Sequence, residues 1–111
     1  MIKAEILLLT AGKSSRMGQP KALLSIKGQS LISYQIDCLK ALDLPITVVL
    51  GAYADEISKA VTSKEVRLVL NKDFEKGMGS SIAFGTTSIQ NTNSEIDAIL
   101  VCAIDQPLIP L

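Results

Sequence analysis

The stretch AEILLLTAG, residues 4–12, decides the fold of this chain. Its first part, Ala4–Leu9, is a compact and largely apolar run that does not alternate between polar and apolar positions. A strand with both faces buried has this pattern, because neither face meets water, and such strands occupy the centre of parallel sheets. The strand is expected to end at the small or polar residues Thr10, Ala11 and Gly12.

Further along the chain, apolar segments alternate with helical patterns. Three of these segments are predicted as strands, at Ile46–Leu50, at Val66–Leu70 and at residues 96–104. Helices are expected from residue 31, with Ser30 as the cap, and at residues 55–61 and 80–89. The Gly-, Ser- and Lys-rich residues 12–28 are expected to form a long loop with room for one short turn of helix. This order predicts an α/β fold with right-handed βαβ units and a four-stranded parallel sheet in one domain, residues 1–111, with Ala4–Leu9 central.

Composition excludes several classes of function. The formal net charge is zero, so no basic surplus exists to hold nucleic acid or an anionic membrane surface. Histidine is absent, which removes Ser-His and Cys-His nucleophile pairs and most zinc sites. Cys38 and Cys102 lie in apolar runs and are predicted to be buried, reduced thiols. The apolar start is too short for a membrane span and lacks a signal-peptide pattern, so a soluble cytoplasmic protein is expected.

Three segments with chemically useful side chains fall where strands are predicted to end. In open α/β sheets, ligands bind beyond the carboxyl ends of the strands. The first segment, residues 9–21, reads LTAGKSSRMGQPK. Its small residues let backbone amides approach a phosphate, and Arg16 and Lys21 can neutralise a polyphosphate. It is neither a P-loop nor a dinucleotide fingerprint, and a solvated Gly/Ser loop with ordinary surface cations is the alternative.

The other two segments are shorter. The second, Gly77-Met78-Gly79-Ser80-Ser81, precedes an expected helix, where the first amides can bind an anion; a flexible turn with a serine cap is the alternative. The third, Asp105-Gln106-Pro107, follows the last predicted strand. A carboxylate there can hold Mg²⁺, which prefers oxygen ligands, whereas a turn-forming aspartate before proline is the alternative.

These motifs together resemble the nucleotidyltransferases that act on the molybdenum cofactor, the MobA-like NTP transferases. The loop matches their signature at Ala11, Gly12, Ser14, Arg16, Met17, Gly18 and Lys21. The segment 77–81, Asn71 and Asp105-Gln106-Pro107 are similar to the cytidylyltransferase (MocA-like) branch. The resemblance implies a three-layer αβα, Rossmann-like fold of the nucleotide-diphospho-sugar transferase type. It also implies that the nucleotide is bound by Thr10, Ala11, Gly12, Ser14, Arg16, Lys21, Asn71, Gly77, Gly79, Ser80 and Ser81.

The implied reaction moves CMP from CTP to a phosphorylated acceptor of the molybdopterin type and releases pyrophosphate. Arg16 and Lys21 would act catalytically by neutralising the triphosphate, and Asp105 would bind Mg²⁺. The acceptor phosphate is already anionic, so no general base is required and the absence of histidine is unimportant. Family members continue beyond the point matching residue 111 with substrate-binding segments and a further acidic metal ligand, so this chain alone is expected to be an incomplete catalyst.

Two alternatives stay open at this point. One is a related transferase that uses GTP or a sugar phosphate; Ala11, where GTP-using members tend to have glycine, favours CTP. The other is a non-catalytic module that binds nucleotide or cofactor and docks on a molybdoenzyme.

Overall fold

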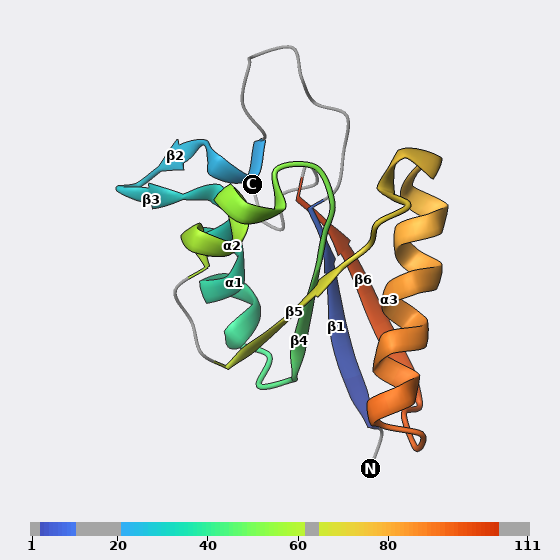
Figure 1. The fold of residues 1–111 in the computed structure, drawn as a ribbon. Helices are drawn as coiled ribbons and strands as arrows, with labels where there is room; N and C mark the ends of the chain where they lie inside the picture. The colour runs from blue at the N-terminus through green and yellow to red at the C-terminus, as the bar shows by residue number, and fades with distance from the viewer. Residues whose placement is uncertain (1–2, 11–20, 62–64, 105–111) are drawn as a thin grey trace.

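Four parallel strands form the centre of the molecule. The computed structural model describes residues 3–10, 21–61 and 65–104. The strand order is β5-β4-β1-β6, with bounds β1 Ala4–Leu9, β4 Ile46–Leu50, β5 Val66–Leu70 and β6 Ala98–Ala103 (Figure 1). The predicted α/β fold with a four-stranded parallel sheet is confirmed, and β1 lies inside the sheet between β4 and β6. β6 is slightly shorter than the predicted strand at residues 96–104.

Helices cover both faces of this sheet, which explains the apolar run in β1. The bounds are α1 Leu31–Lys40 and α2 Ala54–Ala60 on one face, and α3 Met78–Thr92 on the other (Figure 1). Ile6 and Leu8 of β1 pack in the cluster that contains residues of α1 and α2, and Leu7 and Leu9 pack in the cluster on the α3 side. All four side chains are at most 2% exposed, as expected for a strand buried on both faces. Among the described residues, no helix is long and apolar enough to cross a membrane.

The carboxyl ends of the strands meet at one edge because the strands are parallel. The backbone ladder continues one residue beyond each of three strands. Thr10 N–H donates to the Val49 carbonyl (3.2 Å), Asn71 N–H to the Leu50 carbonyl (2.8 Å) and Ile104 N–H to the Leu9 carbonyl (3.0 Å). The residues that follow β1, β5 and β6 are therefore held side by side at this carboxyl edge.

Part of the predicted long loop is structured. The turn η1 at Lys21–Leu23 is followed by a two-stranded hairpin of β2 Ser25–Ile26 and β3 Gln29–Ser30. Lys27 and Gly28 both have positive φ, 51° and 85°, as in the tight turns that join antiparallel strands. The short helical turn expected within residues 12–28 is present as η1, whereas the hairpin was not predicted. The predicted cap of α1 is confirmed, since the Ser30 hydroxyl accepts from Ser33 N–H at 3.2 Å.

The two cysteines differ from the prediction. Both are free, but Cys38 is exposed and Cys102 is partly buried. Cys38 lies between the buried Ile36 and Leu39 in sequence, yet it points away from the buried face of α1 because successive helical residues turn by about 100°. Partial burial raises the pKa of the Cys102 thiol through desolvation. The prediction of two buried thiols is wrong for Cys38.

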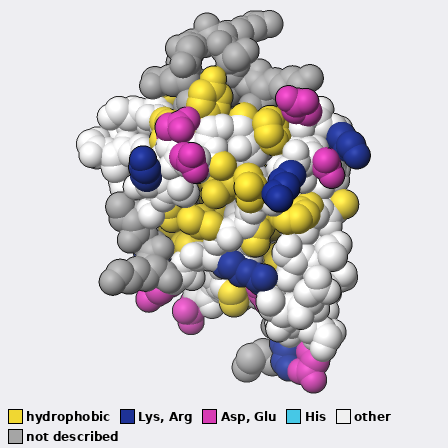
Figure 2. Space-filling view, viewed as in Figure 1, with side chains coloured by type: hydrophobic (Ala, Val, Ile, Leu, Met, Phe, Trp, Pro, Cys, Tyr) yellow, Lys and Arg dark blue, Asp and Glu magenta, His cyan; other side chains and the backbone are white. Residues whose placement is uncertain are grey.

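β5 forms an edge of the sheet, and its side chains reach the surface. Leu68 and Leu70 are 38% and 46% exposed. Figure 2 shows hydrophobic side chains across the middle of this face, with Lys or Arg and Asp or Glu side chains of both signs around them. Val66 and Val69 are partly buried against the clusters on the two faces of the sheet. β5 thus has the apolar composition of a central strand at an edge position.

α3 lies very close to the sheet at Gly85. A Cβ atom at this position would lie 2.4 Å from Leu7 Cδ1 and 2.9 Å from Val49 Cγ2. These two partners are fully buried, so they have little freedom to move aside. Glycine at position 85 is therefore required by the packing of α3 on β1 and β4.

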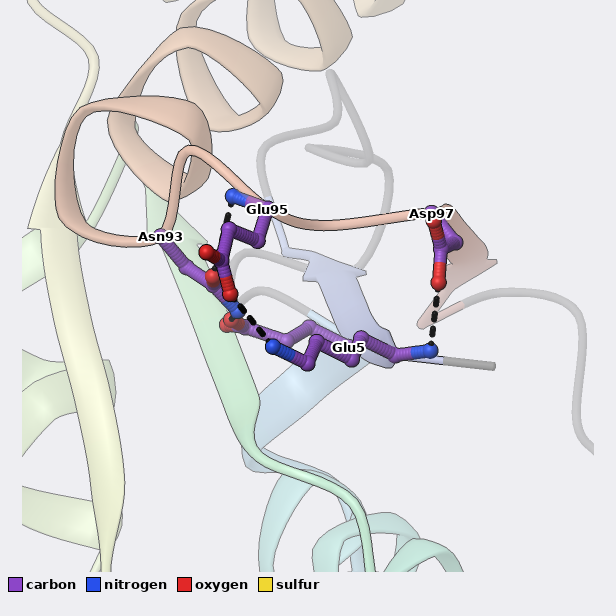
Figure 3. A network of polar contacts seen from close by, with 5 residues as sticks. Glu5, Asn93, Glu95 and Asp97 are labelled. Atoms are coloured by element: carbon purple, nitrogen blue, oxygen red, sulfur yellow. Dashed lines mark hydrogen bonds and ion pairs between the residues drawn. The ribbon is translucent and has the colours of Figure 1, made fainter. Parts of the chain in front are cut away.

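Polar contacts fix the carboxyl end of α3 near the start of β1. Asn93 Nδ2 donates to Glu5 Oε2 (3.0 Å), and the Asn93 side-chain oxygen accepts from Glu95 N–H (3.3 Å) (Figure 3). The side-chain amine of Lys3 forms an ion pair with the Glu95 carboxylate, and the backbone N–H of Lys3 donates to Asp97 Oδ2 at 2.9 Å. Glu5 is only 8% exposed, so Asn93 supplies a hydrogen bond to a buried carboxylate.

Candidate functional site

The site begins at Thr10, the residue that joins β1 to the signature loop. Thr10 is 5% exposed, and its hydroxyl donates to the Val49 carbonyl at 2.7 Å. The same carbonyl accepts from Thr10 N–H. These two bonds to one carbonyl of β4 fix Thr10 at the end of β1. The side-chain bond explains why threonine suits this position.

The second segment meets the end of β5 at the same edge. The turn η2, Phe74–Lys76, leads from Asn71 to α3. Asn71 Nδ2 donates to the hydroxyls of Ser80 (3.2 Å) and Ser81 (3.1 Å). Three residues that the sequence analysis assigned to the site are thus in direct contact. The spacing alone did not predict this contact, because it depends on how η2 turns the chain back toward β5.

The amino end of α3 is open. Its cap residue, Gly77, has φ +103° and is exposed, and no side chain in the described part of the chain caps the helix, so Ser80 and Ser81 do not act as a serine cap. Met78 is 49% exposed, and a Cβ built on Gly79 meets no atom of the described residues within 4 Å. The first N–H groups of a helix lack partners within the helix and carry partial positive charge. This end of α3 therefore offers backbone donors to a polar or anionic group.

Several predicted site residues lie outside the described residues. They are Ala11, Gly12, Ser14, Arg16 and Asp105. Lys21 is described by its backbone, as the first residue of η1. Ile104, directly before Asp105, is bonded to the end of β1, as given above.

The ionisable side chains between Asn71 and α3 are Lys72, Asp73, Glu75 and Lys76. In residues 3–10, 21–61 and 65–104, no group of three His, Cys, Asp or Glu side chains is arranged to hold a metal ion. What the described residues supply is hydroxyls, amides and the open start of a helix.

Comparison with known proteins gives a consistent family. Residues 6–111 match the MobA-like NTP transferase domain. A nicotine blue oxidoreductase of Paenarthrobacter nicotinovorans is 34% identical over 102 residues, which cover 90% of this chain and 48% of that protein. The bifunctional protein GlmU of Desulfitobacterium hafniense is 27% identical over 92% of this chain and 22% of its own length. The chain thus spans about half, or less, of these curated relatives.

Solved structures show the same fold. The crystal structure of Rv0371c from Mycobacterium tuberculosis superposes with a TM-score of 0.83 at 22% identity, covering 97% of this chain and 55% of that one. A nucleotidyl transferase from Methanothermobacter thermautotroptrophicus gives a TM-score of 0.79 at 24% identity, over 96% of this chain and 52% of that one. Rv0371c in complex with manganese gives 0.77 at 18% identity, over 96% and 53%. At these identities the likeness concerns the fold alone.

Proposed function

Because the chain belongs to the MobA-like NTP transferase domain family, we propose that it transfers a nucleoside monophosphate, CMP from CTP, to a phosphorylated acceptor of the molybdopterin type. The observation that carries this proposal is the meeting of three segments at one sheet edge: the end of β1, the contact of Asn71 with the start of α3, and the end of β6. Ligands bind at this edge in open α/β sheets. The preference for CTP rests on Ala11 and on the segment 77–81.

The proposed roles follow from charge and position. Backbone amides after Thr10 bind the triphosphate, and the side chains of Arg16 and Lys21 neutralise it. An oxygen of the acceptor phosphate attacks the α-phosphorus of CTP, the bond from that phosphorus to the bridging oxygen breaks, and pyrophosphate leaves with the bonding electron pair. The acceptor oxygen is already anionic, so the protein contributes binding, orientation and charge neutralisation rather than a base. Asp105 would hold Mg²⁺, which would supply further charge neutralisation; a relative's fold with bound manganese agrees with a divalent cation here.

Binding measurements test the nucleotide site first. Isothermal titration with CTP, GTP and ATP, each with Mg²⁺, is expected to show the tightest binding for CTP. Arg16→Ala and Lys21→Ala should each weaken CTP binding by about 1.5–3 kcal/mol, the contribution of a charge-assisted hydrogen bond. Cytidine has no phosphate and is the matched control ligand, for which the loss should be small. Equal losses for cytidine and CTP would contradict the phosphate role, and a preference for GTP would move the proposal to the related GTP-using transferases.

The metal role has its own variant. Asp105→Asn keeps the side-chain shape but removes the negative charge. It should abolish the increase in CTP affinity that Mg²⁺ produces while leaving thermal unfolding unchanged. If the variant keeps the full Mg²⁺ effect, the cation is held elsewhere. Pyrophosphate release in the presence of a molybdopterin acceptor then separates a transferase from a module that binds nucleotide without turnover.

A second candidate function comes from the relative at 34% identity, which is a nicotine blue oxidoreductase. The same edge would then bind a nucleotide that donates electrons rather than a triphosphate that donates a nucleotidyl group. Bleaching of nicotine blue with a reduced nicotinamide nucleotide, together with no pyrophosphate release from CTP, would favour this candidate. Pyrophosphate release without bleaching would favour the transferase.

A further inference from the structure

Asn71 is held rigidly at the end of β5. Its N–H donates to the Leu50 carbonyl at 2.8 Å, which continues the β4–β5 ladder. Asn71 as a whole residue is only 2% exposed. A ligand at the sheet edge therefore meets almost no surface of Asn71.

Every polar atom of the Asn71 side chain has a partner. Nδ2 uses its two hydrogens on the hydroxyl oxygens of Ser80 and Ser81, at 3.2 and 3.1 Å. Oδ1 accepts from Asp73 N–H at 3.0 Å, which is the short turn that asparagine forms with the residue two positions on. No hydrogen is left on the amide for a nucleotide.

The network closes on itself through Ser80. The Ser80 hydroxyl donates to the Asp73 carbonyl at 3.2 Å, so it accepts from Asn71 and donates to the turn that Asn71 also holds. Ser81 is 1% exposed and is likewise turned inward. Asn71, Asp73, Ser80 and Ser81 thus tie η2 and the first turn of α3 to β5.

This network takes the place of a helix cap. α3 starts at a glycine with φ +103°, which has no side chain to cap the first amides, and no side chain of the described residues is bonded to them. Such a start has little stability of its own, because both the glycine and the unpaired amides favour other conformations. The tethers from Asn71 to Ser80 and Ser81 help to hold it in one place, together with the Ser80–Asp73 bond and the packing of Ile82 against the core.

We propose that Asn71 is a positioning residue of the nucleotide site, which fixes the open amides at the start of α3 in place through Ser80 and Ser81 and does not itself touch the nucleotide. This inference rests on the proposed function, since it concerns the same site. Asparagine suits the role because it combines two donors on one nitrogen with one acceptor; serine is too short to reach the two hydroxyls but can still accept from Asp73 N–H.

A double-mutant cycle tests the inference. CTP affinity with Mg²⁺ is measured by titration calorimetry for the wild type, Asn71→Ala, Ser81→Ala and the double variant. Loss of one tether should weaken CTP binding about three- to tenfold. The double variant should bind CTP no more weakly than the weaker single variant, because both changes break the same tether. Asn93→Ala is the matched control, since Asn93 tethers the other end of α3, and its CTP affinity should equal that of the wild type.

Two further measurements keep the result clear. In titration with cytidine, which lacks the phosphates, Asn71→Ala should lose less affinity than in titration with CTP, because the amides at the start of α3 bind an anionic group. If Asn71→Ala does not fold, Asn71→Ser replaces it, because serine retains the turn to Asp73. Amide exchange in Asn71→Ser should rise in residues 72–81 and stay unchanged in β1.

The outcomes separate the inference from the proposed function. Additive losses in the double variant would mean that Asn71 contacts the nucleotide directly, and an equal loss in Asn93→Ala would mean general loosening of α3. Unchanged amide exchange in residues 72–81 of Asn71→Ser would show that Asn71 does not hold this segment in place. Each of these results overturns the positioning role while wild-type binding of CTP leaves the proposed function standing. If the wild type binds no nucleoside triphosphate, the proposed function itself has failed.

Discussion

The two ends of α3 are each tied to the sheet by an asparagine, but they are built for different purposes. At the amino end, Asn71 bonds to the neutral hydroxyls of Ser80 and Ser81, and the helix amides stay open toward the carboxyl edge. At the other end, Asn93 donates a hydrogen bond to the buried carboxylate of Glu5, and Lys3 and Glu95 form an ion pair nearby (Figure 3). The difference indicates that the amino end is kept available for a ligand, whereas the carboxyl end serves stability.

The largest effect is expected midway between the two ends, at Gly85. Gly85→Ala places a methyl group 2.4 Å from Leu7 Cδ1, in a region where Leu7 and Val49 are fully buried. Overpacking of this kind lowers the free energy of unfolding by about 1–3 kcal/mol. Urea unfolding measures the loss. Gly79→Ala is the same change in the same helix with open space around it, so a similar loss in that variant would contradict the packing explanation.

The next largest effect separates stability from binding. Asn93→Ala removes the partner of a carboxylate that is 8% exposed, and we expect the free energy of unfolding to fall by about 1–2 kcal/mol. CTP affinity should not change, because the carbonyl end of α3 lies at the opposite edge of the sheet from the site. Unfolding and calorimetry on the same sample give both numbers. A drop in CTP affinity would show that the two ends are coupled through the helix.

A smaller effect, of opposite sign, is expected at the amino end. Gly79→Ala should raise the free energy of unfolding by about 0.5–1 kcal/mol, because alanine favours the helix and no described atom opposes its methyl group. The same methyl group would stand beside the open amides, so CTP binding should become weaker. Thermal unfolding and titration check the two signs. A stabilised variant with unchanged CTP affinity would mean that the ligand does not approach α3 at Gly79.

The smallest effect is expected at the exposed ion pair. The side chains of Lys3 and Glu95 are 55% and 73% exposed, so water and salt screen their attraction. Glu95→Gln should change the free energy of unfolding by less than about 0.5 kcal/mol, and the difference should vanish at high salt. Unfolding at low and high ionic strength tests this. A larger, salt-insensitive loss would indicate that Glu95 supports Asn93 through more than its backbone N–H.

The fold could be predicted well where burial leaves a mark on the sequence. Ala4–Leu9 lies between two strands and two helical layers, and its largely apolar run, without alternation from Ile6 to Leu9, reflects that position. Val66–Leu70 has a similar run at a sheet edge, so composition alone does not separate edge from centre. The hairpin of β2 and β3 was missed because strands of two residues are too short to show a period; the dipeptide Lys27-Gly28 was the available signal.

The sequence predicts where the candidate site lies but not the contacts between its described residues. Strand ends could be placed from apolar runs, and the open helix start follows from the glycines at 77 and 79. The bonds from Asn71 to Ser80 and Ser81 depend on the turn η2, whose sequence has no periodic pattern, so the sequence does not predict these bonds. Cys38 was misplaced because an apolar neighbourhood in sequence does not specify which face of a helix a residue occupies. The roles of Arg16, Lys21 and Asp105 stay predictions.

The position of β1 also has a consequence during synthesis. Of the four strands of the sheet, β1 is translated first, yet one of its two neighbours is β6, and Ala4 pairs with Ala98. The β1–β4 and β4–β5 ladders can form while the chain is still emerging. The β1–β6 ladder must close a loop that contains most of the chain, and such non-local pairing is slow. Until Ala98–Ala103 leaves the ribosome, β1 has one row of amide and carbonyl groups without a partner strand. The nascent chain is therefore the form most exposed to edge-to-edge aggregation, and slower translation after residue 70 would lengthen that exposure.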